Sequence, residues 1–215
     1  MIGGKSIRLG SDKGLFNFMG KPLISYQIEI VSQLTNEIFL VANSKEQVRN
    51  YIEKIDISNI LAFIIDESDL VPDPKFRNPM LGLYSTFKEL NKLQYEKVFV
   101  LSCDNPVIQP QVIKFLLDSC VKNDCCIPKW ENGFLEPLFA IYPVALALPR
   151  AEKCIKRQKF KLTNIIDEKW NITYIPIEQS IKMIDPDLLS FKNLNEIEQM
   201  NNLKNILNKF KKKNL

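Results

Sequence analysis

The chain has 215 residues, of which 46% are hydrophobic and 25% charged, as expected for one soluble globular domain spanning residues 1–215. Its apolar runs are far shorter than the ~20 residues of a membrane span, and no signal peptide opens the sequence, so we expect no membrane partner. Four lysines near the C-terminus account for the net charge of +4, and the neutral remainder argues against a nucleic-acid binder.

Short apolar runs alternate with amphipathic segments along the chain. The sequence predicts helices over 22–34, 44–55, 79–93 and 110–121, and strands over 37–43, 61–66, 97–102, 134–142 and 172–176. Ser44 and Gln47 form a predicted capping box. A closing helix is expected over 193–210, within a C-terminal helix and basic tail of 193–215. This alternation predicts a three-layer, doubly wound α/β fold with a mostly parallel sheet.

The N-terminal segment combines glycine with basic residues. Three of the seven glycines fall within eight residues, Gly3 and Gly4 among them. Glycines let backbone amides approach a polyphosphate, and Arg8 and Lys13 supply two positive charges that suit a triphosphate. The segment therefore predicts a phosphate-binding loop, and the alternative is a flexible terminus with accidental glycines.

Asp104 follows the predicted buried strand 97–102. Active sites of open α/β sheets lie at the carboxyl ends of strands. A carboxylate at this position is well placed to hold Mg²⁺, which prefers oxygen ligands and substrate phosphates. The alternative interpretation is an Asp that caps the next turn.

Cysteine and histidine usage limits the chemistry. The cysteines are odd in number and form no CxxC pair, which predicts reduced core thiols and a cytoplasmic protein. The chain contains no histidine, which excludes any imidazole base. Catalysis must therefore use carboxylates, lysines, backbone amides or a metal. The cysteines are Cys103, Cys120, Cys125, Cys126 and Cys154.

Several strings occur in the order of one known family. Residues 3–13 read GGKSIRLGSDK, and residues 20–23 read GKPL. Both resemble the signature of the molybdenum-cofactor guanylyltransferases, whereas sugar-phosphate nucleotidyltransferases typically have Pro-Lys in place of Asp12-Lys13. Further matches are FIID at 63–66, NPMLGL at 78–83, SCDNP at 102–106, EPLFAIY at 136–142 and FKNLN at 191–195.

The resemblance implies a Rossmann-like nucleotidyltransferase fold and a defined reaction. Such enzymes transfer GMP from GTP to the phosphate of molybdopterin, giving the guanine dinucleotide cofactor and pyrophosphate. The expected cofactor is Mg²⁺. The expected partners are GTP, molybdopterin and, transiently, molybdoenzymes or other cofactor-biosynthesis proteins.

The resemblance also implies roles for particular residues. Lys13 and Arg8 would stabilise the leaving pyrophosphate, and Asp104 would hold the nucleotide and its Mg²⁺. Asp66 would lie beside the nucleotide, and Asn43 near the ribose. The remaining implied residues are Gly3 and Gly4 for the nucleotide, and Lys159, Lys161 and Asn193 for the acceptor. Asn193 could equally form an Asx turn or N-cap, and the two lysines a solvated charge run.

Two departures from the family pattern stand out. Asn78 replaces the usual first glycine of its motif, which leaves base selectivity open. In relatives the glycine loop follows a buried apolar strand, whereas here Met1 stands where the motif's leucine belongs. We therefore expect a missing or truncated first strand with unpaired neighbours, and a coding start upstream of Met1.

Three alternatives remain open. The nearest is a molybdopterin cytidylyltransferase or another nucleotidyltransferase that uses a different acceptor. The second is a nucleotide-binding protein without catalytic activity, against which the joint presence of Lys13, Asp66 and Asp104 argues. The third is a nucleic-acid binder that uses the lysine tail, which the neutral body of the chain disfavours.

Overall fold

The computed structural model describes residues 1–2, 5–6, 11–71, 73 and 76–192. The helices are α1 (Leu23–Val31), α2 (Lys45–Lys54), α3 (Pro79–Lys92), α4 (Pro110–Ser119) and α5 (Val144–Lys156). The longer strands are β5 (Phe39–Ala42), β6 (Ala62–Ile65), β7 (Lys97–Leu101), β8 (Cys125–Lys129), β9 (Phe139–Pro143) and β10 (Ile172–Pro176). Two small hairpins lie near the start, β1 (Lys5–Ser6) with β2 (Ser11–Asp12), and β3 (Asn17–Phe18) with β4 (Lys21–Pro22).

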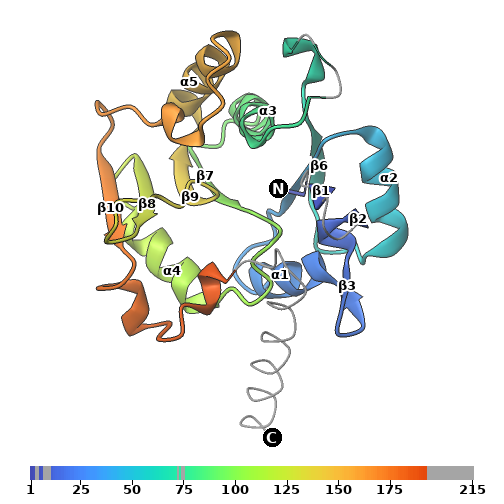
Figure 1. Cartoon of the computed structure of the whole chain (residues 1–215), viewed down its shortest axis with the longest axis horizontal. Coiled ribbons are helices and arrows are strands. Elements are labelled where there is room, and N and C mark those ends of the chain that lie inside the picture. Colours follow the sequence, from blue (N-terminus) through green and yellow to red (C-terminus); the bar gives the residue numbers. More distant parts are fainter. Residues whose placement is uncertain (3–4, 7–10, 72, 74–75, 193–215) are drawn as a thin grey trace, which may run out of the picture.

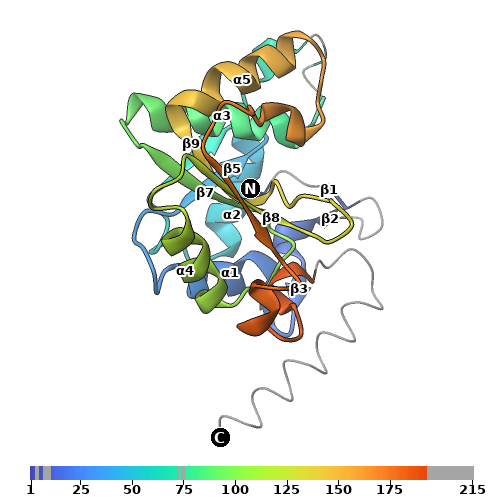
Figure 2. The ribbon, with the colours of Figure 1, turned by 90° about the vertical axis from the view of Figure 1, so that its left-hand side faces the viewer.

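The strands form two groups between layers of helices. One group is the parallel pair β5–β6, and the other has the order β10-β8-β9-β7, in which β9 is antiparallel to both neighbours. Helices α3 and α5 cover one face, and α1 and α4 the other (Figures 1 and 2). The three-layer α/β fold and its mostly parallel strands are therefore confirmed.

Alternation along the strands divides the core between the two faces. In β9, Ala140 and Tyr142 pack in the cluster that contains α3 and α5 residues. Phe139 and Ile141 pack instead with the buried residues of α4. This period of two is what a sheet covered on both faces requires.

A gap separates β5 from β7, and Met1 and Ile2 lie at one end of it, in the middle of the molecule (Figure 1). The Ile2 amide donates to the Val41 carbonyl at 2.9 Å, and the Met1 carbonyl accepts from the Cys103 amide at 3.2 Å. The Met1 ammonium donates to the Leu101 carbonyl at 2.7 Å. The two bonds of Met1 have the pattern of a strand parallel to β7, and the Ile2 bond joins this short segment to β5.

The rest of the gap is a cavity of about 360 Å³ lined mainly by apolar side chains of β5, β7, α1 and α3. The expectation of a missing or truncated first strand is confirmed in this form. One expectation about burial was wrong: the strand over 97–102 was predicted to be covered on both faces, but four of the five residues of β7 are only partly buried. The cavity beside the strand is the reason.

Most predicted elements are present with slightly shorter bounds. The predicted strand over 134–142 is the exception, because only β9 joins the sheet and Leu135 instead bridges to Lys129. The closing helix over 193–210 and the tail of 193–215 lie outside the described residues. No helix in the described part of the chain is long and apolar enough to cross a bilayer.

Candidate active site

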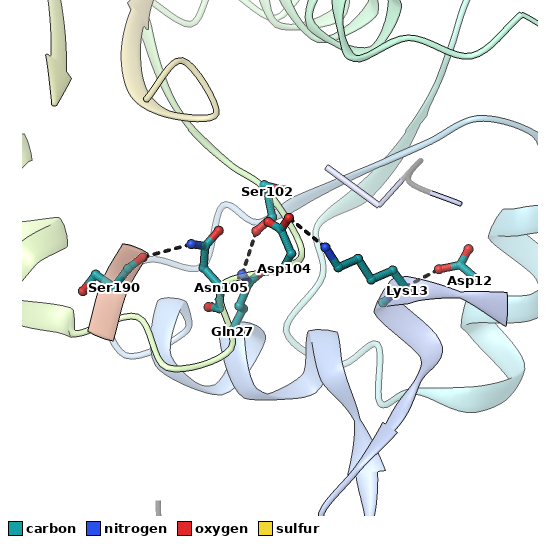
Figure 3. A network of polar contacts seen from close by, with 8 residues as sticks. Asp12, Lys13, Gln27, Ser102, Asp104, Asn105 and Ser190 are labelled. Carbon is teal, nitrogen blue, oxygen red and sulfur yellow. Dashed lines mark hydrogen bonds and ion pairs between the residues drawn. The ribbon is translucent and has the colours of Figure 1, made fainter. Parts of the chain in front are cut away.

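Lys13 and Asp104 meet although 91 positions separate them in the chain. Lys13 opens a 3₁₀ turn, η1 (Lys13–Leu15), and Asp104 lies in the loop after β7. The Nζ of Lys13 lies 2.9 Å from Oδ2 of Asp104, with 9% and 18% of the two side chains exposed (Figure 3). The lysine predicted to bind phosphate and the carboxylate predicted to bind a metal therefore lie next to each other.

Asp12 anchors the turn that presents Lys13. Its Oδ1 accepts from the Gly14 amide at 3.0 Å and from the Tyr51 hydroxyl at 2.6 Å. Its Oδ2 accepts from the Gln47 side-chain amide. Because Gln47 and Tyr51 lie one turn apart on α2, they hold this carboxylate from one helix face. Lys13 is thereby fixed to a rigid element rather than to a loose loop.

Gly14 is required by close packing at this turn. A Cβ on Gly14 would lie 2.2 Å from the Tyr51 hydroxyl oxygen and 3.2 Å from the ring carbon that bears it. The first distance is well inside van der Waals contact, so a side chain at this position would displace Tyr51 or the turn.

The loop that carries Asp104 is fixed to the sheet and to α1. The Ser102 amide donates to the Leu138 carbonyl at 3.0 Å, which continues the pairing of β7 with β9. The side chain of Gln27 donates to carbonyls on both sides of Asp104 (Figure 3). Burial raises the pKa of the adjacent Cys103 thiol to about 12, so this thiol is protonated at neutral pH.

Asp66 ends the neighbouring strand β6, and its amide donates to the Ala42 carbonyl at 2.9 Å. Its Oδ1 is buried and accepts no hydrogen bond from any described residue. Burial raises the pKa of this carboxyl to about 6, against a lowering influence from Arg77 and the N-terminal ammonium. A buried acceptor without a partner is costly unless a ligand supplies a donor. The site of Gly82 lies directly behind it, since a Cβ there would lie 3.3 Å from Oδ1.

The donors available to a metal ion are few. No group of three or more His, Cys, Asp or Glu side chains converges among the described residues. Asp104 offers hard carboxylate oxygens at the carboxyl end of β7. A divalent cation such as Mg²⁺ fits this arrangement if phosphate and water oxygens complete its shell, which is the usual pattern for that ion.

Glu136 adds a second carboxylate to the region. Burial raises its pKa, the Asp104 charge raises it further, and a hydrogen bond from Trp130 opposes the shift. That bond runs from the indole Nε1 to Oε1 of Glu136 at 2.7 Å. Glu136 thus lies within electrostatic range of Asp104.

The remaining predicted site residues are placed less centrally. Asn43 follows β5 at the same sheet edge, and its amide donates to the side-chain oxygen of Gln47 at 2.8 Å. Lys159 and Lys161 are exposed beyond the end of α5. The other predicted residues lie outside the described residues, namely Gly3, Gly4, Arg8 and Asn193.

Three buried residues of the site were not predicted for it. Gln27 and Gln47 are 4% and 7% exposed, and Tyr51 is fully buried. A signal existed, because Gln27 falls on the apolar stripe of α1, one turn after Leu23. A polar residue on a buried stripe needs hydrogen-bond partners and therefore often marks a network.

Asn43, Asp66 and Asp104 follow β5, β6 and β7, and Lys13 reaches the same sheet edge. Ligands of open α/β sheets bind at this edge. The fold and the site therefore define an α/β protein whose strand-end carboxylates and a buried lysine share the edge at which such folds bind ligands.

Comparison with known proteins gives the family. Residues 1–169 match the model of the MobA-like NTP transferase domain. A probable molybdenum cofactor guanylyltransferase of Thermococcus gammatolerans is 33% identical over 184 residues, covering 83% of this chain and 84% of the relative. Its counterpart in Thermococcus kodakarensis is 31% identical over 209 residues, covering 94% and 91%. The chain belongs to the MobA-like NTP transferase family and is a nucleotidyltransferase.

A solved structure supports the fold. The molybdopterin-guanine dinucleotide biosynthesis protein A of Archaeoglobus fulgidus aligns with a TM-score of 0.74 at 24% identity. The alignment covers 97% of this chain and 96% of that protein. The described elements therefore share the fold of that protein over almost their whole length.

Proposed function

We propose that this protein transfers GMP from GTP to the phosphate of molybdopterin, releasing pyrophosphate and forming a guanine dinucleotide cofactor. The observation that carries the proposal is the 2.9 Å ion pair between Lys13 and Asp104. It brings the cation expected for a triphosphate and the carboxylate expected for its metal to one point. The names of the relatives, which match over most of this chain, supply the substrates.

The reaction suits a chain without histidine. An oxygen of the acceptor phosphate attacks the α-phosphorus of GTP, and the bond from that phosphorus to pyrophosphate breaks. A phosphate nucleophile is already ionised at neutral pH, so it needs no strong base. The residues then act mainly by positioning and charge neutralisation.

Each residue has a defined part in this proposal. Lys13 binds the phosphates that leave as pyrophosphate, and Arg8 assists it with the amides of Gly3 and Gly4. Asp104 holds Mg²⁺, which when bound neutralises phosphate charge. The buried Oδ1 of Asp66 accepts a hydrogen bond from the nucleotide, and Asn43 contacts its ribose.

The acceptor phosphate needs contacts of its own. Lys159, Lys161 and Asn193 contact the phosphate of molybdopterin in this account. The single domain of residues 1–215 works in the cytoplasm. It passes its product to molybdoenzymes or to other cofactor-biosynthesis proteins through transient contacts.

Asn78, which replaces the usual first glycine of its motif, does not prevent the backbone of this segment from lining a pocket for the nucleotide base. Asn78 has φ −151° and caps α3, since its Oδ1 accepts from the Met80 amide at 2.9 Å. This extended conformation needs no glycine, and a side-chain oxygen is what a helix N-cap requires. GTP therefore stays the first choice, and CTP is the alternative.

The test mixes the protein, Mg²⁺, molybdopterin and one labelled nucleotide at a time. We expect pyrophosphate release to require GTP and the acceptor together, and to be much slower with CTP or ATP. Preference for CTP would assign the cytidylyltransferase alternative. Binding of GTP without turnover under any condition would assign the non-catalytic one.

A further inference from the structure

One buried side chain holds both ends of the loop that carries Asp104. The Nε2 of Gln27 donates to the Ser102 carbonyl at 2.7 Å and to the Asn105 carbonyl at 3.0 Å (Figure 3). These two carbonyls bracket Cys103 and Asp104. A single amide therefore satisfies two backbone acceptors and closes the loop around the carboxylate.

The position of Gln27 makes these bonds consequential. It is 4% exposed and shares the buried face of α1 with Leu23, Ile24 and Ile28. A polar group at such a place is destabilising unless it is hydrogen-bonded, and so are the carbonyls that it satisfies. These bonds therefore fix the position of the Asp104 loop relative to α1.

A second contact restrains the far end of the same loop. The side-chain amide of Asn105 donates to the Ser190 carbonyl at 3.0 Å, and the Ser190 hydroxyl accepts from the Gln109 amide at 3.0 Å. Asp185 in turn accepts from the amides of Leu189 and Ser190. The loop is therefore held between α1 and the segment 185–190.

We propose that Gln27 is a positioning residue that fixes the Asp104 carboxylate for the metal-bound triphosphate. This proposal rests on the proposed function for the role of Asp104, but not for the clamp itself. Lys13 pairs with Asp104 at 2.9 Å and must shift toward phosphate when the nucleotide binds. The backbone clamp then keeps the carboxylate in place, and small displacements at a reacting centre reduce rates steeply.

The test uses Gln27→Glu, which keeps the shape of the side chain but turns a donor toward two carbonyls into an acceptor. Gln33→Glu is the matched control, because Gln33 is exposed just beyond the end of the same helix and its side chain donates to the Glu29 carbonyl. Both variants change the charge equally. Gln27→Met serves as a second variant, since it removes the donor without placing a charge in the apolar face.

The first readout is alkylation of Cys103 by iodoacetamide, resolved by peptide mapping. All five cysteines are buried, so the other four report on the rest of the fold in the same sample. We expect Gln27→Glu or Gln27→Met to label Cys103 at least about tenfold faster, with the other four unchanged. Gln33→Glu should behave as the parent protein.

The second readout is the Mn²⁺ concentration that gives half-maximal binding to the protein–GTP mixture, measured by electron paramagnetic resonance. We expect it to rise about tenfold in the Gln27 variants, equivalent to about 1.4 kcal/mol, and to stay constant in Gln33→Glu. Parent-like labelling of Cys103 together with parent-like Mn²⁺ binding in both Gln27 variants would overturn the proposal. Absence of turnover in the parent protein would count against the proposed function, while the labelling pattern would still decide the role of Gln27.

Discussion

Lys13 is a buried cation whose partner is the Asp104 carboxylate, and the turn that presents it is held by Asp12. The glycine-rich string and the strand-end position of Asp104 indicated both residues. The sequence could not indicate that they form a direct pair, because this depends on how η1 docks onto α2. Asp12 decides that docking, and its three hydrogen bonds come from residues distant in the chain or across the turn.

Replacing Lys13 by Ala should reduce turnover by about 10²–10³-fold, the effect of losing one preorganised charge-stabilising group. The fold should survive, because Asp104 keeps partial access to water. Steady-state pyrophosphate release and thermal melting measure the two effects. Lys54→Ala, at the exposed end of α2, is the control and should be neutral. Near-normal turnover of Lys13→Ala would remove this residue from the mechanism.

Asp66 leads to a prediction about pH. The pKa of its carboxyl rises from 3.8 to about 6 because of burial, so the folded state holds the proton more tightly than the unfolded state. The free energy of unfolding should therefore fall as pH rises from about 4 to about 6, and the loss persists above that range. Asp66→Asn carries no charge and should be more stable than the parent by about 1–3 kcal/mol above pH 6.

Chemical denaturation at about pH 4 and about pH 7.5 measures the difference, which should vanish at the lower value. The same variant should bind nucleotide more weakly, because a neutral amide oxygen is a weaker acceptor than a charged carboxylate oxygen. A stability difference that is the same at both pH values would show that Asp66 does not carry the effect.

The packing of η1 against α2 can be tested with a double-mutant cycle of Gly14 and Tyr51. Gly14→Ala would place a Cβ 2.2 Å from the Tyr51 hydroxyl oxygen, and should destabilise the fold by about 1–3 kcal/mol. Tyr51→Phe removes that oxygen and its bond to Asp12, at a cost of about 1 kcal/mol. In the double variant the clash is relieved, so the loss should be smaller than the sum. Urea denaturation of the four proteins measures the coupling, and strict additivity would contradict the packing.

Capped helix starts were the most predictable features, and elements with an interior proline were the least predictable. Ser44 and Asn78 cap α2 and α3 with side-chain oxygens, as local sequence rules require. No helix was predicted over α5, which has Pro149 in its interior, and no strand over β8, which contains Pro128. Both form because their apolar residues pack in the core, which overrides local preference.

At the scale of the whole molecule, the sequence predicted the layers and the incomplete sheet, but not the cavity between β5 and β7. The Val41 and Leu101 carbonyls accept hydrogen bonds from Ile2 and Met1. Because backbone groups two residues apart in a strand point to the same side, those of Phe39 and Phe99 point toward this cavity. The Met1 ammonium lies at its end, and burial lowers the pKa of this group. An extended apolar segment attached to the amino group of Met1 would fit this cavity.

Attaching six apolar, β-branched residues to the amide of Met1 should therefore raise the melting temperature by about 10 °C, since each ~1 kcal/mol shifts it by a few degrees in a chain of this size. A Gly/Ser extension of equal length removes the same buried charge but offers no apolar side chains. It should give a much smaller increase. Circular dichroism measures the melting temperatures. Equal melting temperatures of the two extended proteins would mean that the cavity does not accept a strand.

The arrangement of Lys13 and Asp104 around one metal-bound triphosphate is tested most directly by a crystal structure of the chain with GTP and Mn²⁺. Anomalous scattering then locates the metal. The account predicts a manganese peak within coordination distance of an Asp104 oxygen and a Lys13 Nζ that has moved from Asp104 to a phosphate oxygen. A bound nucleotide with its metal away from Asp104, or with the Lys13–Asp104 pair unchanged, would contradict it.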